Sequence, residues 1–464
     1  MRPPSARKIA YHDSKHGEVR SDVYHWLQDK ADPKVIAYLT AENNYYDAVM
    51  RPLADMVNEL FTETVARIPQ MENSVPIQHG NYFYDWRQEK DLQYRIYCRK
   101  RADSRSELAS AAEEVLLDAN QLVEPGEYLG YGEVSVSNDE RYLAYLINRD
   151  GSDEHTLFIK DLVTGELLPE VIPGLFSDGT EGAVAWSVDD TYLFFISTDE
   201  LGREYRLWRH ELGTPLDQAE LLYEERDPRF YVYIYRSQSK RFLFIRSEAS
   251  TTVELRIIDL ANPLAPVRLF KPRRTDVEYQ IEHWQDSFMV LTNDGGATNF
   301  RLERYSLDDF ADLIEVVPYD ESRYLIGLHS FRDMLYVSGR ADGLTQVWRL
   351  DGNELVRLVW DEDVYTVTAL PQQDYDAAEL VVQFESLITP ETAYAIDLET
   401  NERKLLQQKR VAGSYDSENY VQRRVFAAAE DGSRIPILLV YHKDALKQGP
   451  APLELYAYGG YCIS

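Results

Sequence analysis

A pattern that recurs about every fifty residues constrains this chain more than any other feature of its sequence. Three copies are clear, and they begin at Ser137, Ser187 and Ser237. They read SNDERYLAYLINRDGSDEHTLFIKDL, SVDDTYLFFISTDELGREYRLWRHEL and SQSKRFLFIRSEASTTVELRIIDL. Each copy has a polar turn, a strand of aromatic and aliphatic residues, a polar loop and a second strand. The pattern predicts a β-hairpin that is repeated along the chain.

Weaker copies bring the number of repeated units to seven. Equivalent strand positions fall at Tyr82, Tyr142, Tyr192, Phe242, Phe288, Leu335 and Leu380. Successive positions differ by 60, 50, 50, 46, 47 and 45 residues, which is enough for a four-stranded sheet in each unit. A solenoid of β-hairpins is possible, but it does not explain why the count stops at seven. The sequence therefore predicts a mainly β protein with a closed seven-bladed β-propeller over residues 71–410, a fold that leaves few strand edges exposed.

Residues 1–70 precede the repeat and predict an extended segment followed by helices. Residues 1–20 are polar and are expected to be extended. Asp32 is a suitable N-cap and proline suits the first helical position, so a helix should run from Pro33 to Met50. A second helix is expected next, because apolar residues recur at helical spacing: Leu53, Met56, Val57, Leu60 and Phe61.

Residues 411–464 lose the repeat and predict the start of a third domain. A hairpin is expected around Glu430-Asp431-Gly432, followed by a loop that contains prolines. The apolar segment LELYAY, residues 453–458, has the composition of a buried strand in an α/β sheet. No later segment could supply neighbouring strands, so we expect this domain to be incomplete.

The formal net charge of −30 bears on the partners of the chain. A strongly acidic field repels nucleic acid and anionic lipid and attracts cationic ligands, and plain solubility is the alternative explanation. Two acidic segments, YDESRY at 319–324 and WDEDVY at 360–365, are expected to be solvated turns, with an acidic rim for basic peptides as the alternative. We therefore expect neither a nucleic acid nor a membrane as a partner.

The sequence also lacks the signals of several other classes of protein. It has no signal-peptide h-region and no apolar run of about 18 residues, so the cytoplasm is the expected location. Cys98 and Cys462 lie far apart and suggest no disulfide framework. There is no P-loop and no clustered His/Cys metal spacing, so we expect neither a cofactor nor a bound metal.

Four stretches carry a likeness to a known family. They are YHWLQDKADPKVIAYLTAENNYYDAVM near the N-terminus, LWRHELGTPLDQAELLYEERDPRFYV and KPRRTDVEYQIEHWQDSFMVLTNDGGATNF in the repeat, and LELYAYGGY near the end. In this order they resemble the prolyl oligopeptidase family of serine peptidases, and within it the oligopeptidase B (protease II) branch. The resemblance covers essentially the whole chain.

This resemblance implies a seven-bladed propeller placed over an α/β-hydrolase domain. It identifies residues 411–464 as the first strands of that catalytic domain. In this family the propeller restricts access to short peptides, and the oligopeptidase B branch cleaves after Arg or Lys. The implied partners are therefore short basic peptides.

The catalytic residues that the resemblance implies are almost all absent. The family uses a Ser-His-Asp triad, but the 464 residues contain no Gly-x-Ser-x-Gly nucleophile elbow. All nine histidines precede the strand after which the family places its triad. Tyr458 aligns with the family tyrosine whose hydroxyl helps to stabilise the oxyanion, and Gly459 and Gly460 would give the following turn its freedom.

We therefore expect the N-terminal part of an oligopeptidase B-like enzyme, with no peptidase activity in this polypeptide alone. A standalone propeller that binds basic peptides or a partner protein is a second hypothesis. One half of a split peptidase, with the triad on a separate hydrolase-domain chain, is a third. The apolar strand expected at 453–458 argues against the standalone propeller, because an unpaired apolar edge favours aggregation.

Overall fold

The computed structural model describes residues 2–124, 126–177, 182–310, 312–371, 374–447 and 449–458. The chain forms two compact units. One contains residues 1–69 and 411–414, and the other contains residues 70–410 and 415–464. The second unit holds the repeated sequence pattern and positions the candidate site.

The first unit contains the two helices that the sequence predicts. Helix α1 spans Pro33–Met50, and Asp32 caps it by accepting a hydrogen bond from the backbone N–H of Lys34 at 2.8 Å. A short 3-10 turn, η2 (Arg51–Leu53), leads into α2 (Ala54–Arg67). The apolar side chains predicted for the second helix are between 41% and 68% exposed: Leu53, Met56, Val57, Leu60 and Phe61.

Residues 1–20 differ from the extended segment that the sequence predicts, because part of them forms a hairpin. Strands β1 (His12–Lys15) and β2 (Glu18–Ser21) form an antiparallel hairpin, and η1 (His25–Gln28) follows it. The turn between the strands places His16 and Gly17 at positive φ, 53° and 83°. Glycine permits this turn geometry. The two strands are short and polar, so their sequence lacks the hydrophobic alternation that would predict them.

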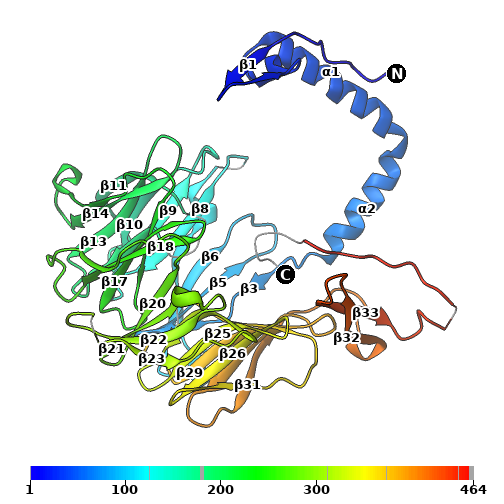
Figure 1. The fold of residues 1–464 in the computed structure, drawn as a ribbon. Coiled ribbons are helices and arrows are strands. Elements are labelled where there is room, and N and C mark those ends of the chain that lie inside the picture. Colours follow the sequence, from blue (N-terminus) through cyan, green and yellow to red (C-terminus); the bar gives the residue numbers. More distant parts are fainter. Residues whose placement is uncertain are drawn as a thin grey trace. The chain divides into compact units, whose positions relative to one another are not determined.

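Seven antiparallel sheets of the second unit follow one another in chain order as the blades of a propeller (Figure 1). This confirms the predicted fold. The strands of blades 1 to 4 are β3 (Glu72–Asn73), β4 (Ile77–His79), β5 (Tyr82–Gln88), β6 (Ile96–Arg101) and β7 (Glu113–Asp118); β8 (Gly130–Val136), β9 (Tyr142–Asn148), β10 (His155–Asp161) and β11 (Leu167–Leu175); β12 (Val184–Trp186), β13 (Tyr192–Thr198), β14 (Glu204–Glu211) and β15 (Glu220–Glu224); β16 (Tyr231–Arg236), β17 (Phe242–Ala249), β18 (Thr252–Asp259) and β19 (Arg268–Lys271).

The remaining three blades have the same plan. Their strands are β20 (Tyr279–Trp284), β21 (Ser287–Thr292), β22 (Arg301–Ser306) and β23 (Ile314–Val317); β24 (Arg323–Ser330), β25 (Leu335–Ala341), β26 (Leu344–Asp351) and β27 (Glu354–Arg357); β28 (Thr366–Ala369), β29 (Glu379–Glu385), β30 (Thr392–Asp397) and β31 (Arg403–Gln408). Short 3-10 turns between strands are η3 (Arg105–Glu107), η4 (Ala119–Leu122), η5 (Leu216–Gln218) and η6 (Asp294–Gly296). All seven positions that the sequence marks as equivalent lie in the second strands, β5, β9, β13, β17, β21, β25 and β29.

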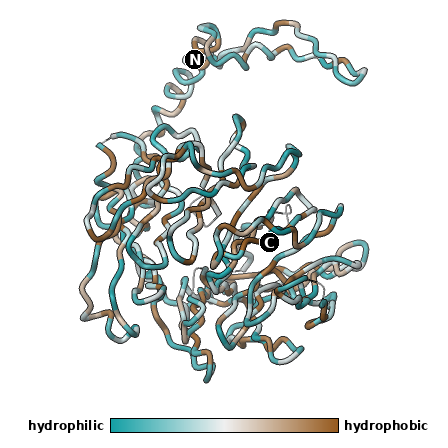
Figure 2. Tube along the Cα trace, turned by 90° about the vertical axis from the view of Figure 1, so that its left-hand side faces the viewer, coloured by the Kyte–Doolittle hydropathy of each residue, from teal (hydrophilic) through white to brown (hydrophobic). Residues whose placement is uncertain are grey.

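Apolar packing between neighbouring blades forms the core. All six residues of β21 are buried, because a blade covers each face of the strand. Six clusters of buried apolar residues each join two consecutive blades, from blades 1 and 2 to blades 6 and 7. Apolar residues accordingly follow the strands and polar residues the turns (Figure 2). Full burial of a side chain such as Phe244 contributes about 1.5–3 kcal/mol, so this packing is the main stabilising term.

The two ends of the propeller carry different loops. Strands within a blade are antiparallel and follow one another in order, so the first strand starts at the end where the fourth strand finishes. We call this the exit end; it carries the second-to-third strand hairpins and the connections between blades. The opposite end, which we call the far end, carries the other turns. The chain enters the propeller before β3 and leaves it after β31, so both passages lie at the exit end.

A hairpin follows the propeller, and the strand predicted after it does not form. Strands β32 (Tyr420–Ala428) and β33 (Arg434–His442) pair in antiparallel fashion after η7 (Ser417–Asn419), and the turn at Gly432 has φ 86°, as predicted around residues 430–432. Residues 453–458 have irregular backbone and are exposed. Their apolar composition suits a strand, but a strand requires hydrogen bonds from a neighbour, and the described residues beside them supply none.

Buried histidines predict that the fold loses stability in mild acid. Burial lowers the pKa of His283 to about 4, helped by nearby Arg241, and burial alone lowers the pKa of His329 to about 4. An unfolded histidine titrates near pH 6.5, so between about pH 6.5 and 4 the unfolded chain binds more protons. Stability is therefore complete above about pH 6.5 and falls as the pH drops toward 4.

Urea unfolding between pH 4.5 and 7.5 measures this effect. His283→Gln should reduce the slope of unfolding free energy against pH by about 1.4 kcal/mol per pH unit, the contribution of one proton. The exposed His12 provides the control, because His12→Gln should leave the slope unchanged. Equal slopes in the native protein and His283→Gln would contradict the assignment.

Candidate functional site

The structure places Tyr458, the residue proposed for an oxyanion hole, in an irregular segment with 56% of its surface exposed. Gly459 and Gly460, which were expected to form the following turn, lie outside the described residues. A hydroxyl donor stabilises an oxyanion only when it is held toward the reacting atom. An exposed side chain on irregular backbone is not held in this way, so Tyr458 alone forms no catalytic site.

The histidines of the propeller are buried parts of its blades. Burial, together with Lys240 and Arg236, lowers the pKa of His79 to about 3. His283 shares a hydrogen bond of 2.7 Å with the hydroxyl of Ser239. Such neutral histidines are not poised as general bases near pH 7. Across the described part of the chain, no group of three or more His, Cys, Asp or Glu side chains could hold a metal, and no helix is long and apolar enough to cross a membrane.

The segment at 360–365 lies at the exit end and is in part the solvated turn that we expect and in part a packed junction. Trp360 and Tyr365 are buried in the core between blades 6 and 7, and Val364 is buried as well. The carboxylate of Glu362 accepts hydrogen bonds from Thr389 Oγ1, at 2.5 Å, and from the side-chain amide of Gln422 in β32. Asp361 and Asp363 remain exposed, so only Glu362 and the apolar side chains of the segment are packed against the propeller.

A second contact attaches the hairpin to the same end. The hydroxyl of Tyr415 donates a hydrogen bond to the backbone carbonyl of Ile388, in the second-to-third strand hairpin of blade 7. With the contact of Glu362 to Gln422, it ties the start of the C-terminal region to blade 7 (Figure 1). The exit end therefore holds the hairpin that follows the propeller.

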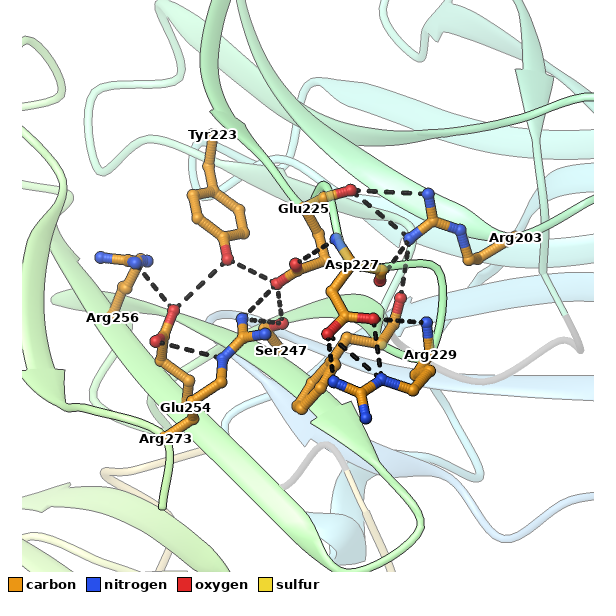
Figure 3. Close-up of polar contacts among 10 residues, drawn as sticks. Arg203, Tyr223, Glu225, Asp227, Arg229, Ser247, Glu254, Arg256 and Arg273 are labelled. Atoms are coloured by element: carbon orange, nitrogen blue, oxygen red, sulfur yellow. Dashed lines mark hydrogen bonds and ion pairs between the residues drawn. The ribbon is translucent and has the colours of Figure 1, made fainter. Parts of the chain in front are cut away.

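The densest polar arrangement at the exit end surrounds the buried carboxylate of Glu225, and we call it the Glu225 network (Figure 3). Glu225 lies on the connection between blades 3 and 4. Its Oε2 accepts hydrogen bonds from Ser247 Oγ at 2.6 Å, from the hydroxyl of Tyr223 at 2.8 Å and from the Arg273 guanidinium. Its Oε1 accepts the backbone N–H of Asp227 at 2.9 Å. Contacts from three stretches far apart in sequence thus meet on one carboxylate.

Two further arginines complete the network. Arg256 donates to Glu254 Oε1 at 2.7 Å, and Arg273 Nε lies 3.5 Å from Glu254 Oε2. Arg203, in the hairpin between β13 and β14, donates to the backbone carbonyl of Phe230 at 2.9 Å and to that of Asp227 at 3.2 Å. These bonds hold the connection between blades 3 and 4 from both sides.

The partners of Glu225 keep its carboxyl group ionised. Burial opposes ionisation of Glu225, but hydrogen bonds from Arg273 and Ser247 outweigh it and hold the carboxyl pKa below its usual value. Burial, followed by the hydrogen bond to Glu225, raises the pKa of Tyr223 to about 12. A paired, ionised carboxylate and a neutral phenol offer neither a nucleophile nor a general base near pH 7. The network is a structural clamp and not a catalytic centre.

Sequence reasoning missed the chemistry of this network. The sequence presents Glu225 and Arg273 in separate repeats, 48 residues apart. The run KPRR at 271–274 begins one of the stretches that resemble the family, but nothing in it indicates a contact with Glu225. Each of these segments has the composition of an ordinary turn. The only sequence signal for a special role at Glu225 is that the stretch YEERDPRF resembles one family.

Comparison with known proteins identifies relatives across nearly the whole chain. A model of one protein family, described as the N-terminal β-propeller domain of prolyl oligopeptidase, matches residues 3–409. A protease 2 from Moraxella lacunata is 43% identical over 461 residues, and a dipeptidyl aminopeptidase BI from Pseudoxanthomonas mexicana is 36% identical over 481 residues. The alignments cover 99% and 100% of this chain but 66% and 65% of the two relatives. The chain thus spans about two-thirds of their length.

Solved structures give the same result. Oligopeptidase B from Leishmania major superimposes with a TM-score of 0.86 at 28% identity, over 96% of this chain and 66% of that one. Oligopeptidase B from Trypanosoma brucei, in a closed form with covalently bound antipain, has a TM-score of 0.85 at 28% identity, over 97% of this chain and 66% of that one. These similarities confirm the family resemblance that the sequence suggests.

The Glu225 network predicts a specific loss of stability. Glu225→Ala should lower the free energy of unfolding by about 2–3 kcal/mol, because it leaves Arg273 and the buried hydroxyls of Tyr223 and Ser247 without their acceptor. Urea denaturation followed by circular dichroism measures the change. The exposed ion pair of Asp227 with Arg229 supplies the control, and Arg229→Ala should cause no comparable loss. Similar losses in both variants would contradict the clamp.

Proposed function

Because the chain belongs to the prolyl oligopeptidase family, we propose that it is the propeller-containing part of a serine oligopeptidase that cleaves short peptides after Arg or Lys. The observation that supports this best is the seven-bladed propeller itself, together with the match of residues 3–409 to the family's propeller domain. In this proposal the propeller does no chemistry. It limits which peptides reach a catalytic domain at its exit end.

The hairpin after the propeller supports the presence of such a domain. Strand β33 reads RIPILLVYH and is apolar on both faces, a pattern typical of a strand buried on both sides in an α/β sheet. Ile435, Leu438 and Val440 are between 42% and 49% exposed in this chain. We propose that residues 411–464 begin the α/β-hydrolase domain, after an N-terminal segment of residues 1–70 and a propeller of residues 71–410.

Two observations support the proposed preference for basic residues: the net charge and the resemblance to the oligopeptidase B branch. The net charge of −30 attracts peptides that carry Arg or Lys and raises their local concentration. The relatives named oligopeptidase B and protease 2 support the same branch. The acidic groups that would hold the basic side chain itself are assigned to the catalytic domain and not to the propeller.

Tyr458 is proposed as one donor of the oxyanion hole in a completed catalytic domain. Its hydroxyl would donate to the negative oxygen of the tetrahedral intermediate, alongside the backbone N–H that follows the catalytic serine. In this role the tyrosine gains its effect from fixed orientation, which the neighbouring strands of a complete sheet would provide. The polypeptide alone is therefore proposed to be inactive.

A split peptidase is the second candidate, and the exposed faces of β33 favour it over a standalone binding propeller. Exposed apolar strands promote association and aggregation, so a standalone propeller with an exposed β33 would be prone to aggregate. A separate chain that carries Ser, Asp and His and covers β33 would remove this tendency to aggregate. Co-purification with a hydrolase-domain polypeptide would support this alternative.

The first prediction from this proposal concerns activity. The purified 464-residue polypeptide should not hydrolyse a fluorogenic dipeptide that ends in Arg, because no Gly-x-Ser-x-Gly nucleophile occurs in it. A chimaera that continues from Ser464 into the C-terminal third of the Moraxella relative should hydrolyse it. Turnover by the 464-residue polypeptide that a serine-directed fluorophosphonate abolishes would contradict the prediction.

The second prediction tests Tyr458 in the same chimaera. Tyr458→Phe should lower kcat by about 10²–10³-fold with little change in KM, because one donor to the oxyanion is lost only in the transition state. Tyr456, two residues earlier and 86% exposed, is the matched control, and Tyr456→Phe should leave kcat unchanged. A kcat for Tyr458→Phe within twofold of the parent would refute the role, even if the chimaera is active.

A further inference from the structure

At the far end, hydrogen bonds link each blade to the next. Asn81 of blade 1 donates its backbone N–H to Glu140 Oε1 of blade 2 at 2.7 Å. Asn138 of blade 2 donates its backbone N–H to Asp190 Oδ1 of blade 3 at 2.8 Å. The series continues around the ring with Val188 N–H to Leu260 O at 3.2 Å, Gln238 N–H to Glu282 Oε1 at 3.0 Å, Ser330 Oγ to Glu282 Oε1 at 3.2 Å, and Arg332 Nε to Asp376 Oδ1 at 2.6 Å.

The turns that make these contacts share an unusual backbone conformation. In blades 1 to 5 the same turn position has φ between 55° and 64°, at Gly80, Glu140, Asp190, Lys240 and Gln285. Side chains with a Cβ rarely adopt this conformation, and it persists where the surroundings require it. Glu140, Asp190 and Lys240 each use the side chain to reach another blade. A glycine would relieve the strain but would lose the contact.

Residues 374–376, in the corresponding turn of blade 7, contact blades that are not adjacent to blade 7. Asp374 Oδ2 accepts the backbone N–H of Gly80 in blade 1 at 2.7 Å and lies 3.7 Å from Lys240 Nζ in blade 4. The hydroxyl of Tyr375 accepts the backbone N–H of Gln285 in blade 5 at 3.1 Å. With the contact to blade 6 described above, residues 374–376 touch four other blades. Blades 4 and 5 are not neighbours of blade 7, so two of these contacts cross the middle of the ring.

The junction between blades 7 and 1 is where such contacts matter most. No strand is shared between these two blades, because each described blade consists of consecutive strands. The six apolar clusters join blades 1 through 7 in order, and none within the described residues joins blade 7 back to blade 1. A cavity of about 170 Å³ lies there, lined in part by buried Phe83 of blade 1 and Val381 of blade 7. It lies beside the hydrogen bond of 2.6 Å from Arg105 Nε to Glu379 Oε2.

We propose that the turn at residues 374–376, with Lys240 and the hydrogen-bonded turns of the other blades, is a latch that closes the propeller ring at the far end. The latch takes the place of the shared strand that the last junction lacks, and it adds to the few apolar contacts there. The side chains of its turn residues make contacts that a glycine could not make, and Asp374 joins blade 7 to blades 1 and 4 in this way. The proposal concerns the ring itself and holds whether or not the chain acts as a peptidase.

Hydrogen exchange measured by mass spectrometry on the full chain tests the latch. Asp374→Ala should accelerate exchange about tenfold in β5 and β6 of blade 1 and in β29 of blade 7, because the junction between these blades opens more often. Exchange in β13 and β14 of blade 3, which apolar clusters flank on both sides, should stay unchanged. Acceleration confined to the Gly80 amide, or equal in all seven blades, would overturn the proposal.

A second variant separates the latch from simple damage to the fold. Lys240→Gly removes the contact to Asp374 and at the same time relieves the backbone strain at φ 61°. A purely structural turn would then exchange more slowly or at the native rate, whereas the latch requires faster exchange in blades 7 and 1. Asp153, at φ 66° in an exit-end hairpin of blade 2, is the matched control. Asp153→Gly should leave exchange in blades 7 and 1 at the native rate, and faster exchange in both glycine variants would overturn the proposal.

Discussion

Everything in the second unit depends on the burial of two apolar faces for every blade. A single blade would expose both faces to water, so the hydrophobic gain is complete only when each blade has two neighbours. Six junctions meet this requirement with clusters of buried side chains, such as the one in which Trp186 of blade 3 packs against blade 2. The seventh junction has no such cluster within the described residues, and it adds polar contacts to a few buried apolar residues such as Phe83 and Val381. The ring is therefore held by apolar packing along most of its circumference and by directed hydrogen bonds where the chain begins and ends its circuit.

The sequence predicts the propeller well because its signal is local and repeated. Strand, turn and strand recur in each unit, and errors in one weak copy are corrected by the spacing of the others. Helix α1 can be predicted equally well from the sequence, since Asp32 and Pro33 specify its start within two residues. The short hairpin at residues 12–21 and the irregular backbone at 453–458 were not. The first has almost no apolar alternation, and the second has the composition of a strand without a partner to pair with.

The polar sites could not be derived from the sequence for a different reason. The carboxylate of Glu225 collects donors from residues up to 48 positions away, and Asp374 accepts from Gly80, 294 positions away. No periodicity links such residues, because their contacts arise only once the ring has closed. Even the positive φ of Glu140 and Lys240 contradicts the usual preference for glycine in that conformation. These are positions at which local propensity yields to long-range contacts.

The contrast between two kinds of apolar strand indicates where the propeller stops supporting itself. Strand β21 and strand β33 are both rich in aliphatic residues, but the first is buried along its whole length and the second is largely exposed. Yet β32, its partner, is held at the exit end through Gln422 and Glu362. An exposed strand in a hairpin fixed to one end of a rigid ring is a starting edge for further sheet, because register and direction are already set. In the function that we propose, the propeller therefore contributes a fixed base for the α/β sheet of the catalytic domain.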